Sequence, residues 1–131
     1  MSIDNECIFC KKKNYKIISS SDYFFIIRDT VYPVTKYHTL IITNRHISSY
    51  FDLNNDELKD LNQLLKKQKK ELEILDKDIS GFNIGVNIGK VAGQSIMHCH
   101  IHLIPRRKDD VEDPRGGVRG VIPSKQKYTR K

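Results

Sequence analysis

Short stretches rich in aromatic and β-branched residues precede one long helical pattern in this chain. Tyr15–Ile18 and Tyr23–Ile27 have the composition of strands, and the polar run Ser19–Asp22 between them predicts the turn of a hairpin. A third strand is expected over Tyr37–Thr43. The first third of the chain is therefore predicted to build antiparallel strands.

One amphipathic helix is expected after a short segment at His46–Phe51. Asn54 or Asn55 can cap it, and leucines recur near the 3.6-residue period through Asp56–Leu75. The opposite face is rich in lysine, which is typical of a solvated helix surface rather than a nucleic-acid site.

The pattern returns to strands after the helix. Gly81 is expected to end the helical region, and strands are predicted over Phe82–Ile88 and His98–Ile104, with a loop over Gly89–Ser95 between them. Three strands, a helix and two strands indicate an antiparallel α+β domain rather than a parallel doubly wound sheet.

A length of 131 residues predicts a single domain. We expect residues 1–107 to form its core. Residues 108–131 are polar, basic and rich in glycine, and they are expected to form an irregular tail of the same domain.

The formal net charge of +7 favours anionic partners. The basic residues are dispersed and no basic strand studded with aromatic residues is present, so phosphate-bearing metabolites are preferred over nucleic acid. Residues 1–6 lack the basic start and apolar core of a signal peptide, and no stretch approaches the ~20 apolar residues of a membrane span. We therefore expect a cytoplasmic protein with no membrane partner.

Three histidines alternate at positions 98, 100 and 102. On a strand they point to one face, while Cys99 and Ile101 point to the core. Neighbouring histidines lie about 6–7 Å apart at the backbone, so two imidazoles can reach one phosphate group. An ordinary half-buried strand rarely has this pattern, and a metal-binding ladder is the stronger alternative.

The segment Gly93–Arg106, with the sequence Gly-Gln-Ser-Ile-Met-His-Cys-His-Ile-His-Leu-Ile-Pro-Arg, resembles the signature of the histidine-triad (HIT) superfamily. The similarity extends from Cys7 to Arg107. This resemblance implies a five-stranded antiparallel sheet with one long and one or two short helices, a homodimer, and transfer of a nucleotidyl group to a histidine.

The resemblance also implies roles for three histidines. His100 would be the nucleophile that attacks the α-phosphorus, and His102 would contact the transferred phosphate. His38 matches a buried histidine that supports the nucleophile from a neighbouring strand. For His38 alone, a core histidine with satisfied hydrogen bonds is an equal alternative.

Further positions match the substrate contacts of the superfamily. Asp29 would accept hydrogen bonds from the ribose hydroxyls, although the segment from Asp29 to His38 is one residue longer than in the pattern. The resemblance assigns Asn87, Gln94, Ser95 and the backbone of Gly93 to the phosphate, and Ile8, Phe9, Ile27 and Arg28 to the base pocket. For the three apolar residues of that pocket, plain core packing is the competing interpretation.

Cys7 and Cys10 are spaced so that both can bind one zinc ion, and two distant histidines, His46 and His98, would complete a closed tetrahedral site of the structural kind. A subset of the superfamily has a site with this pattern. A redox role for the two cysteines is weaker, because only six residues precede them. Cysteines without a metal are the third alternative.

The preferred substrates are dinucleoside polyphosphates such as diadenosine tetraphosphate, because residues 116–128 resemble the end of bacterial members that hydrolyse them. Nucleoside phosphoramidates, a phosphorylase reaction and a non-catalytic nucleotide-binding module remain alternatives. Galactose-1-phosphate uridylyltransferases are disfavoured, since their third triad position is normally Gln and here is His102.

Overall fold

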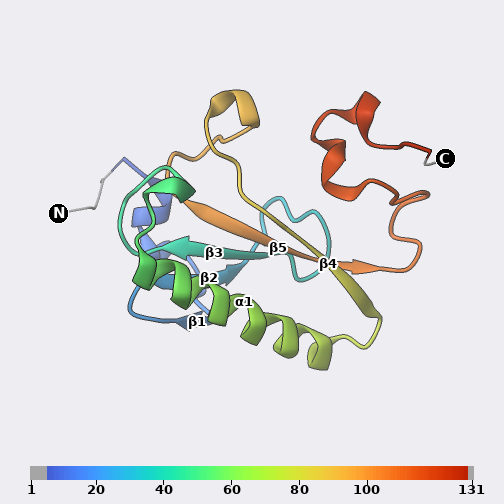
Figure 1. Ribbon diagram of the computed structural model, residues 1–131. Coiled ribbons are helices and arrows are strands. Elements are labelled where there is room, and N and C mark those ends of the chain that lie inside the picture. The colour runs from blue at the N-terminus through green and yellow to red at the C-terminus, as the bar shows by residue number, and fades with distance from the viewer. Residues whose placement is uncertain (1–5, 130–131) are drawn as a thin grey trace.

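The computed structural model describes residues 6–129, and it shows a five-stranded antiparallel sheet with one long helix along one face (Figure 1). The strands lie in the order β1-β2-β3-β5-β4. This confirms the antiparallel α+β class. Residues 1–5, which carry most of the argument against a signal peptide, and residues 130–131 lie outside the described part. The strands are β1 (Ser19–Ser20), β2 (Phe24–Arg28), β3 (Thr39–Thr43), β4 (Ile79–Gly85) and β5 (His100–Arg107).

The helix α1 spans Asn55–Leu75, as the leucine period predicts. Asn54 is its N-cap: the Asn54 side chain accepts the Glu57 N–H, and the Glu57 carboxylate accepts the Asn54 N–H. This capping box satisfies two N–H groups that would otherwise lack partners. No helix among residues 6–129 is long and apolar enough to cross a membrane.

The first strand differs from the prediction. Tyr15–Ile18 is not a strand, and the two residues of β1, Ser19–Ser20, fall where a turn was expected. Two short 3-10 helices, η1 (Ile8–Cys10) and η2 (Lys12–Asn14), bring the chain to Tyr15, whose ring packs against Phe9. Tyr15 is therefore used for packing beside the sheet instead of strand pairing.

The strand after the helix begins earlier than predicted. The helix ends at Leu75, and Gly81 lies inside β4, paired with Arg106, rather than ending the helical region. Asp76 stops the helix because its side chain accepts the Asp78 N–H in a tight turn. The register is irregular between Ile79 and Gly81, where a residue without a side chain is tolerated.

Three further 3-10 helices, η3 (Tyr50–Asp52), η4 (Lys90–Ala92) and η5 (Gly117–Val121), lie in connections and in the tail. A fourth, η6 (Pro123–Lys125), follows η5, so the segment expected to be irregular contains two helical turns. Arg119 stabilises them by donating hydrogen bonds to the carbonyl groups of Lys125 and Gln126. The tail folds up beyond one end of the sheet (Figure 1).

The two faces of the sheet have different partners. On one face, Phe24, Ile26 and Ile41 pack with leucines of α1. On the other, Phe25 and Leu40 form a second cluster that includes Phe9 from the N-terminal segment. Strand alternation on β5 buries Ile101 and Leu103 toward α1, as it does Cys99 just before the strand, and leaves His100 and His102 half-buried on the opposite face.

Candidate active site and metal centre

A pocket of about 400 Å³ lies on the sheet face opposite α1. It brings together eight of the residues singled out in the sequence: Ile8, Phe9, Ile27, Arg28, Asp29, Ser95, His100 and His102. Sequence reasoning missed six others: Tyr15, Thr30, Val31, Tyr32, Leu40 and Ile96. Leu40 could have been found from its spacing of two from His38; the rest come from loops with no periodic signal.

His100 has one ring nitrogen committed to the backbone. Its Nδ1 lies 2.7 Å from the carbonyl oxygen of His98, so Nδ1 carries the proton and donates it to that oxygen. In the neutral ring Nε2 is then the basic nitrogen. Burial lowers the pKa of His100, opposed by the His98 carbonyl and by Asp29, so the ring is neutral near pH 7.

His38 and His102 form a second, directed pair. The Val34 N–H donates to Nδ1 of His38 at 3.0 Å, so the proton of neutral His38 is on Nε2. That Nε2–H lies 2.9 Å from Nδ1 of His102, which must accept it and carry its own proton on Nε2. Burial, with added repulsion from His100 and His38, lowers the pKa of His102 to about 4. His102 is therefore a neutral hydrogen-bond donor at the pocket.

Asp29 is held at the rim of the pocket. Its Oδ1 accepts the N–H groups of Val31 and Tyr32, both at 3.1 Å. Its Oδ2 is 3.9 Å from Nδ1 of His38, but that nitrogen already accepts a hydrogen bond and has no proton to share. The remaining acceptor capacity of this carboxylate is available to a hydroxyl group in the pocket.

Arg28 lines the pocket, yet its charged group points to the other side of the sheet. Nη1 donates to Thr39 Oγ1 at 2.8 Å and to Oε1 of the fully buried Gln68 on α1 at 2.7 Å. Burial lowers the pKa of Arg28, opposed by Glu71 and Tyr37. The guanidinium group thus fastens β2 and β3 to the helix, away from the expected base pocket.

Three residues expected at the phosphate lie outside the lining of this pocket: Asn87, Gly93 and Gln94. Gln94 is buried, and its side chain accepts the Gly89 N–H and donates to the carbonyl oxygens of Ser48 and Ile96. Gly93 has a left-handed φ of 96° at the end of η4. Gln94 therefore shapes the loop that presents Ser95 to the pocket.

Four side chains with metal-binding atoms meet next to this pocket: Cys7, Cys10, His46 and His98. Their ligand atoms all lie within 4.8 Å of one another. His98 is fully buried, and its Nε2–H donates to the Thr43 carbonyl at 2.8 Å, which leaves Nδ1 facing the cluster. The three cysteines of the chain are not joined in disulfides.

The spacing of these atoms fits a tetrahedral zinc ion. Zinc bound at the usual distances would hold two nitrogens about 3.3 Å apart and a nitrogen and a sulfur about 3.6 Å apart. Here Nδ1 of His46 and Nδ1 of His98 are 3.1 Å apart. The Cys7 and Cys10 sulfurs lie 3.3 and 3.5 Å from Nδ1 of His98. The donor set and its geometry therefore suit a closed Cys₂His₂ site.

Comparisons with known proteins agree with this geometry. The HIT domain family model matches residues 11–109. An uncharacterized HIT-like protein of Methanocaldococcus jannaschii is 36% identical over 111 residues, covering 81% of this chain and 83% of the relative. The adenosine 5'-monophosphoramidase of Saccharomyces cerevisiae is 30% identical over 113 residues, covering 82% of this chain and 67% of the enzyme. The asymmetrical bis(5'-nucleosyl)-tetraphosphatase of Schizosaccharomyces pombe is 36% identical over 81 residues, covering 62% and 44%.

Solved structures of HIT family proteins are also similar to this chain. A HIT family protein from Bacillus anthracis has a TM-score of 0.72 at 29% identity, covering 80% of this chain and 76% of that one. A zinc-bound histidine triad family protein from Mycobacterium smegmatis has a TM-score of 0.71 at 27% identity, covering 82% and 79%. On the evidence of its triad, its sheet and these matches, the chain belongs to the HIT (histidine-triad) family.

Proposed function

We propose that the protein is a nucleotide hydrolase that cleaves at the α-phosphate through a covalent nucleotidyl-histidine on His100. The observation that carries the proposal is the hydrogen bond from Nδ1–H of His100 to the His98 carbonyl, in a ring that lines the pocket. This hydrogen bond makes Nε2 the basic nitrogen, and burial lowers the pKa of the ring and keeps it neutral. These are the two requirements for a histidine nucleophile.

In the first step, Nε2 of His100 bonds to the α-phosphorus and the bond from phosphorus to the leaving atom breaks. The imidazole becomes positively charged, and the His98 carbonyl stabilises that charge through Nδ1–H. Water then attacks the same phosphorus, the N–P bond breaks, and His100 returns to its neutral form as a nucleoside monophosphate and a proton are released. A polyphosphate leaving group departs as an anion and needs no proton.

His102 and His38 would support this step as a pair. With its Nδ1 accepting from His38, His102 presents Nε2–H to the pocket, where it can hydrogen-bond a phosphate oxygen or the departing atom. The donor is already oriented before the nucleotide binds, so no reorganisation is required when charge develops. His38 is thereby a positioning residue and not a group that touches the substrate.

The rest of the pocket suits a nucleoside. Phe9, Ile27 and Leu40 provide an apolar floor for a base, and the anchored Asp29 carboxylate can accept from ribose hydroxyls. We propose Ser95 as a phosphate contact, because it is exposed and lines the same pocket as both histidines. Asn87, Gly93 and Gln94 do not line the pocket. We propose that they act on the phosphate only indirectly, through the loop that carries Ser95.

We favour dinucleoside polyphosphates as substrates, in keeping with the basic tail. A second candidate is hydrolysis of adenosine phosphoramidates. It is favoured by the yeast monophosphoramidase, which aligns with 82% of this chain, whereas the fission yeast tetraphosphatase aligns with 62%. Both reactions use the same attack by His100 and differ in the leaving group.

We also propose that Cys7, Cys10, His46 and His98 hold one structural zinc ion. The fit of the four ligand atoms supports this, as does the zinc-bound relative from Mycobacterium smegmatis. A bound zinc ion would cross-link the N-terminal segment to the segment after β3 and the segment before β5, without an open coordination position. Through its backbone carbonyl, His98 would then connect this centre to the nucleophile.

A homodimer is proposed through the β4 edge of the sheet. β4 has β5 on one side only, so it is a sheet edge, and its Ile84 is 52% exposed. At the end of α1, Ile74 and Leu75 are also exposed. A two-fold axis beside this edge would cover both apolar groups of each protomer.

Parallel assays with diadenosine tetraphosphate, an adenosine phosphoramidate, and either substrate plus inorganic phosphate test the proposed function. Release of a nucleoside monophosphate from diadenosine tetraphosphate is the expected result. Faster cleavage of the phosphoramidate would select the second candidate, and a nucleoside diphosphate formed only with added phosphate would indicate a phosphorylase. Nucleotide binding with no turnover of any substrate would overturn the proposal.

A further inference from the structure

One buried residue at the end of β3, Thr43, makes hydrogen bonds to the surroundings of both histidines of the metal cluster. Thr43 is fully buried, and its carbonyl oxygen accepts the Nε2–H of His98 at 2.8 Å. That bond is the one that leaves Nδ1 of His98 for a metal. We infer that Thr43 is a positioning residue for both histidine ligands, and this inference rests on the proposed zinc centre.

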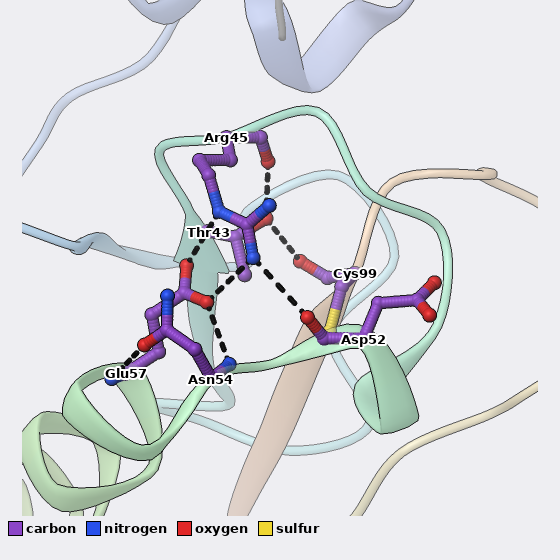
Figure 2. A network of polar contacts seen from close by, with 6 residues as sticks. All are labelled: Thr43, Arg45, Asp52, Asn54, Glu57 and Cys99. Atoms are coloured by element: carbon purple, nitrogen blue, oxygen red, sulfur yellow. Dashed lines mark hydrogen bonds and ion pairs between the residues drawn. The ribbon is translucent and has the colours of Figure 1, made fainter.

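The Thr43 side chain reaches the residues next to both ligands (Figure 2). Its hydroxyl donates to the Arg45 carbonyl at 2.7 Å and lies 3.4 Å from the Cys99 carbonyl. Arg45 immediately precedes His46, and Cys99 immediately follows His98. One hydroxyl group therefore bridges the carbonyl just before His46 and the carbonyl of the residue just after His98, two segments that are more than fifty residues apart in the chain.

Backbone hydrogen bonds complete the bridge. The Thr43 N–H donates to the Cys99 carbonyl at 3.2 Å, and the Cys99 N–H donates to the Ile47 carbonyl at 2.6 Å. The segment around His46 and the start of β5 are thus held face to face. The distance of 3.1 Å between the two Nδ1 atoms follows from this arrangement.

Arg45 fastens the same segment to the start of α1 (Figure 2). Its Nη2 and Nε donate to the two carboxylate oxygens of Glu57 at 2.6 and 3.0 Å, and Nη2 also donates to the Asp52 carbonyl at 3.2 Å. Glu57 is fully buried and also closes the capping box with Asn54. A two-pronged pair with a buried carboxylate fixes both direction and distance.

The consequence is a coupling between this network and metal affinity. Residues that orient metal ligands without touching the metal typically change metal affinity by about 10- to 100-fold when they are lost. Thr43→Val keeps the branched shape and the backbone bonds but removes the hydroxyl. Thr43→Ser keeps the hydroxyl. We expect the first variant to bind zinc about 10-fold more weakly or worse, and the second to bind it nearly as wild type does.

The experiment uses the full chain loaded with zinc and measures transfer of zinc to a chromophoric chelator. Cobalt(II) substitution gives a second readout, because tetrahedral thiolate ligation has a characteristic absorption that a distorted site changes. The matched control is Asn54→Ala, which removes the cap beside Glu57 but leaves the Arg45–Glu57 pair. It should lower thermal stability without changing zinc affinity.

Zinc affinity and a cobalt spectrum identical to wild type in Thr43→Val would overturn the inference. If that variant does not fold, Arg45→Lys serves in its place: the Arg45 side chain is 42% exposed, and lysine keeps the charge but loses the two-pronged geometry. Unchanged affinity there would equally overturn it. A wild-type protein that binds no zinc removes the centre and this inference together, whereas the nucleotide assays report on His100 separately.

Discussion

Nε2 of His38 lies 2.9 Å from Nδ1 of His102, and the direction of that bond is set by the Val34 N–H on the far side of His38. A backbone group in the loop between β2 and β3 thereby determines which nitrogen of His102 carries a proton. The donor that His102 presents to the pocket is thus specified by a chain of two neutral hydrogen bonds.

His38→Leu should lower kcat moderately. Without the His38 donor, neutral His102 divides its proton between both nitrogens, and the cost is about that of one neutral hydrogen bond, about 1 kcal/mol. We expect a loss of about fivefold to tenfold in kcat. Steady-state kinetics measure it. In a His102→Ala background the same change should have little further effect, and full additivity would contradict the pairing.

His100→Ala should reduce turnover at least about 10³-fold with the fold intact, because it removes the group that bonds to phosphorus. Nucleotide binding should persist, since the proposed base and ribose contacts are made by other residues that line the pocket. His102→Ala should lose about 10²- to 10³-fold, as for one transition-state donor. Rapid quenching under mildly basic conditions and peptide mapping locate the labelled histidine. A label on His98 or His102 would show that the nucleophile is misplaced.

The sequence predicts well those features that depend on near neighbours. The cap at Asn54 and the leucine period are local, and the alternation of His100 and His102 follows from strand geometry. The expected strand at Tyr15–Ile18 fails because Tyr15 has a better partner in Phe9, which no local pattern reveals.

The side-chain roles at the site are less predictable. Arg28 and Gln94 sit where the family pattern expects substrate contacts, yet each makes its hydrogen bonds to protein groups that are distant in the sequence: Gln68 for Arg28 and Ser48 for Gln94. Thr43 gives no sequence signal at all, since an inward-facing threonine on a strand is ordinary. Such networks depend on which segments the fold brings together.

Purified protein should contain about one zinc ion per chain, measured by elemental analysis without added metal. Because the ion would join the N-terminal segment to the segments that follow β3 and precede β5, chelation should lower the melting temperature by at least about 5 °C. His98→Ala should lose both metal and stability, whereas His100→Ala should keep its zinc. Metal far below one ion per chain, together with a Cys7–Cys10 disulfide, would contradict the assignment.

The β4 edge predicts the oligomeric state. Light scattering at micromolar concentration should give the mass of a dimer, and Ile84→Lys should shift it toward a monomer, because a charge would be buried at the interface. Ile17→Lys, just before β1 at the opposite edge of the sheet, is the matched control and should stay dimeric. A wild-type monomer would remove the proposed interface and leave the chemistry of His100 unaffected.

Acid should destabilise the protein through His102. The pKa of His102 is about 4 in the folded chain, below its ordinary value of 6.5, so between these values the unfolded chain binds a proton that the folded chain does not. The free energy of unfolding should therefore fall as the pH drops from 6.5 to 4, and this contribution should be complete above pH 6.5. Urea unfolding of zinc-saturated protein measures it. His102→Asn should reduce the slope of unfolding free energy against pH by up to one proton. Zinc release affects the wild-type protein and the variant alike. Equal slopes for the two proteins would therefore show that His102 is not held neutral by the fold.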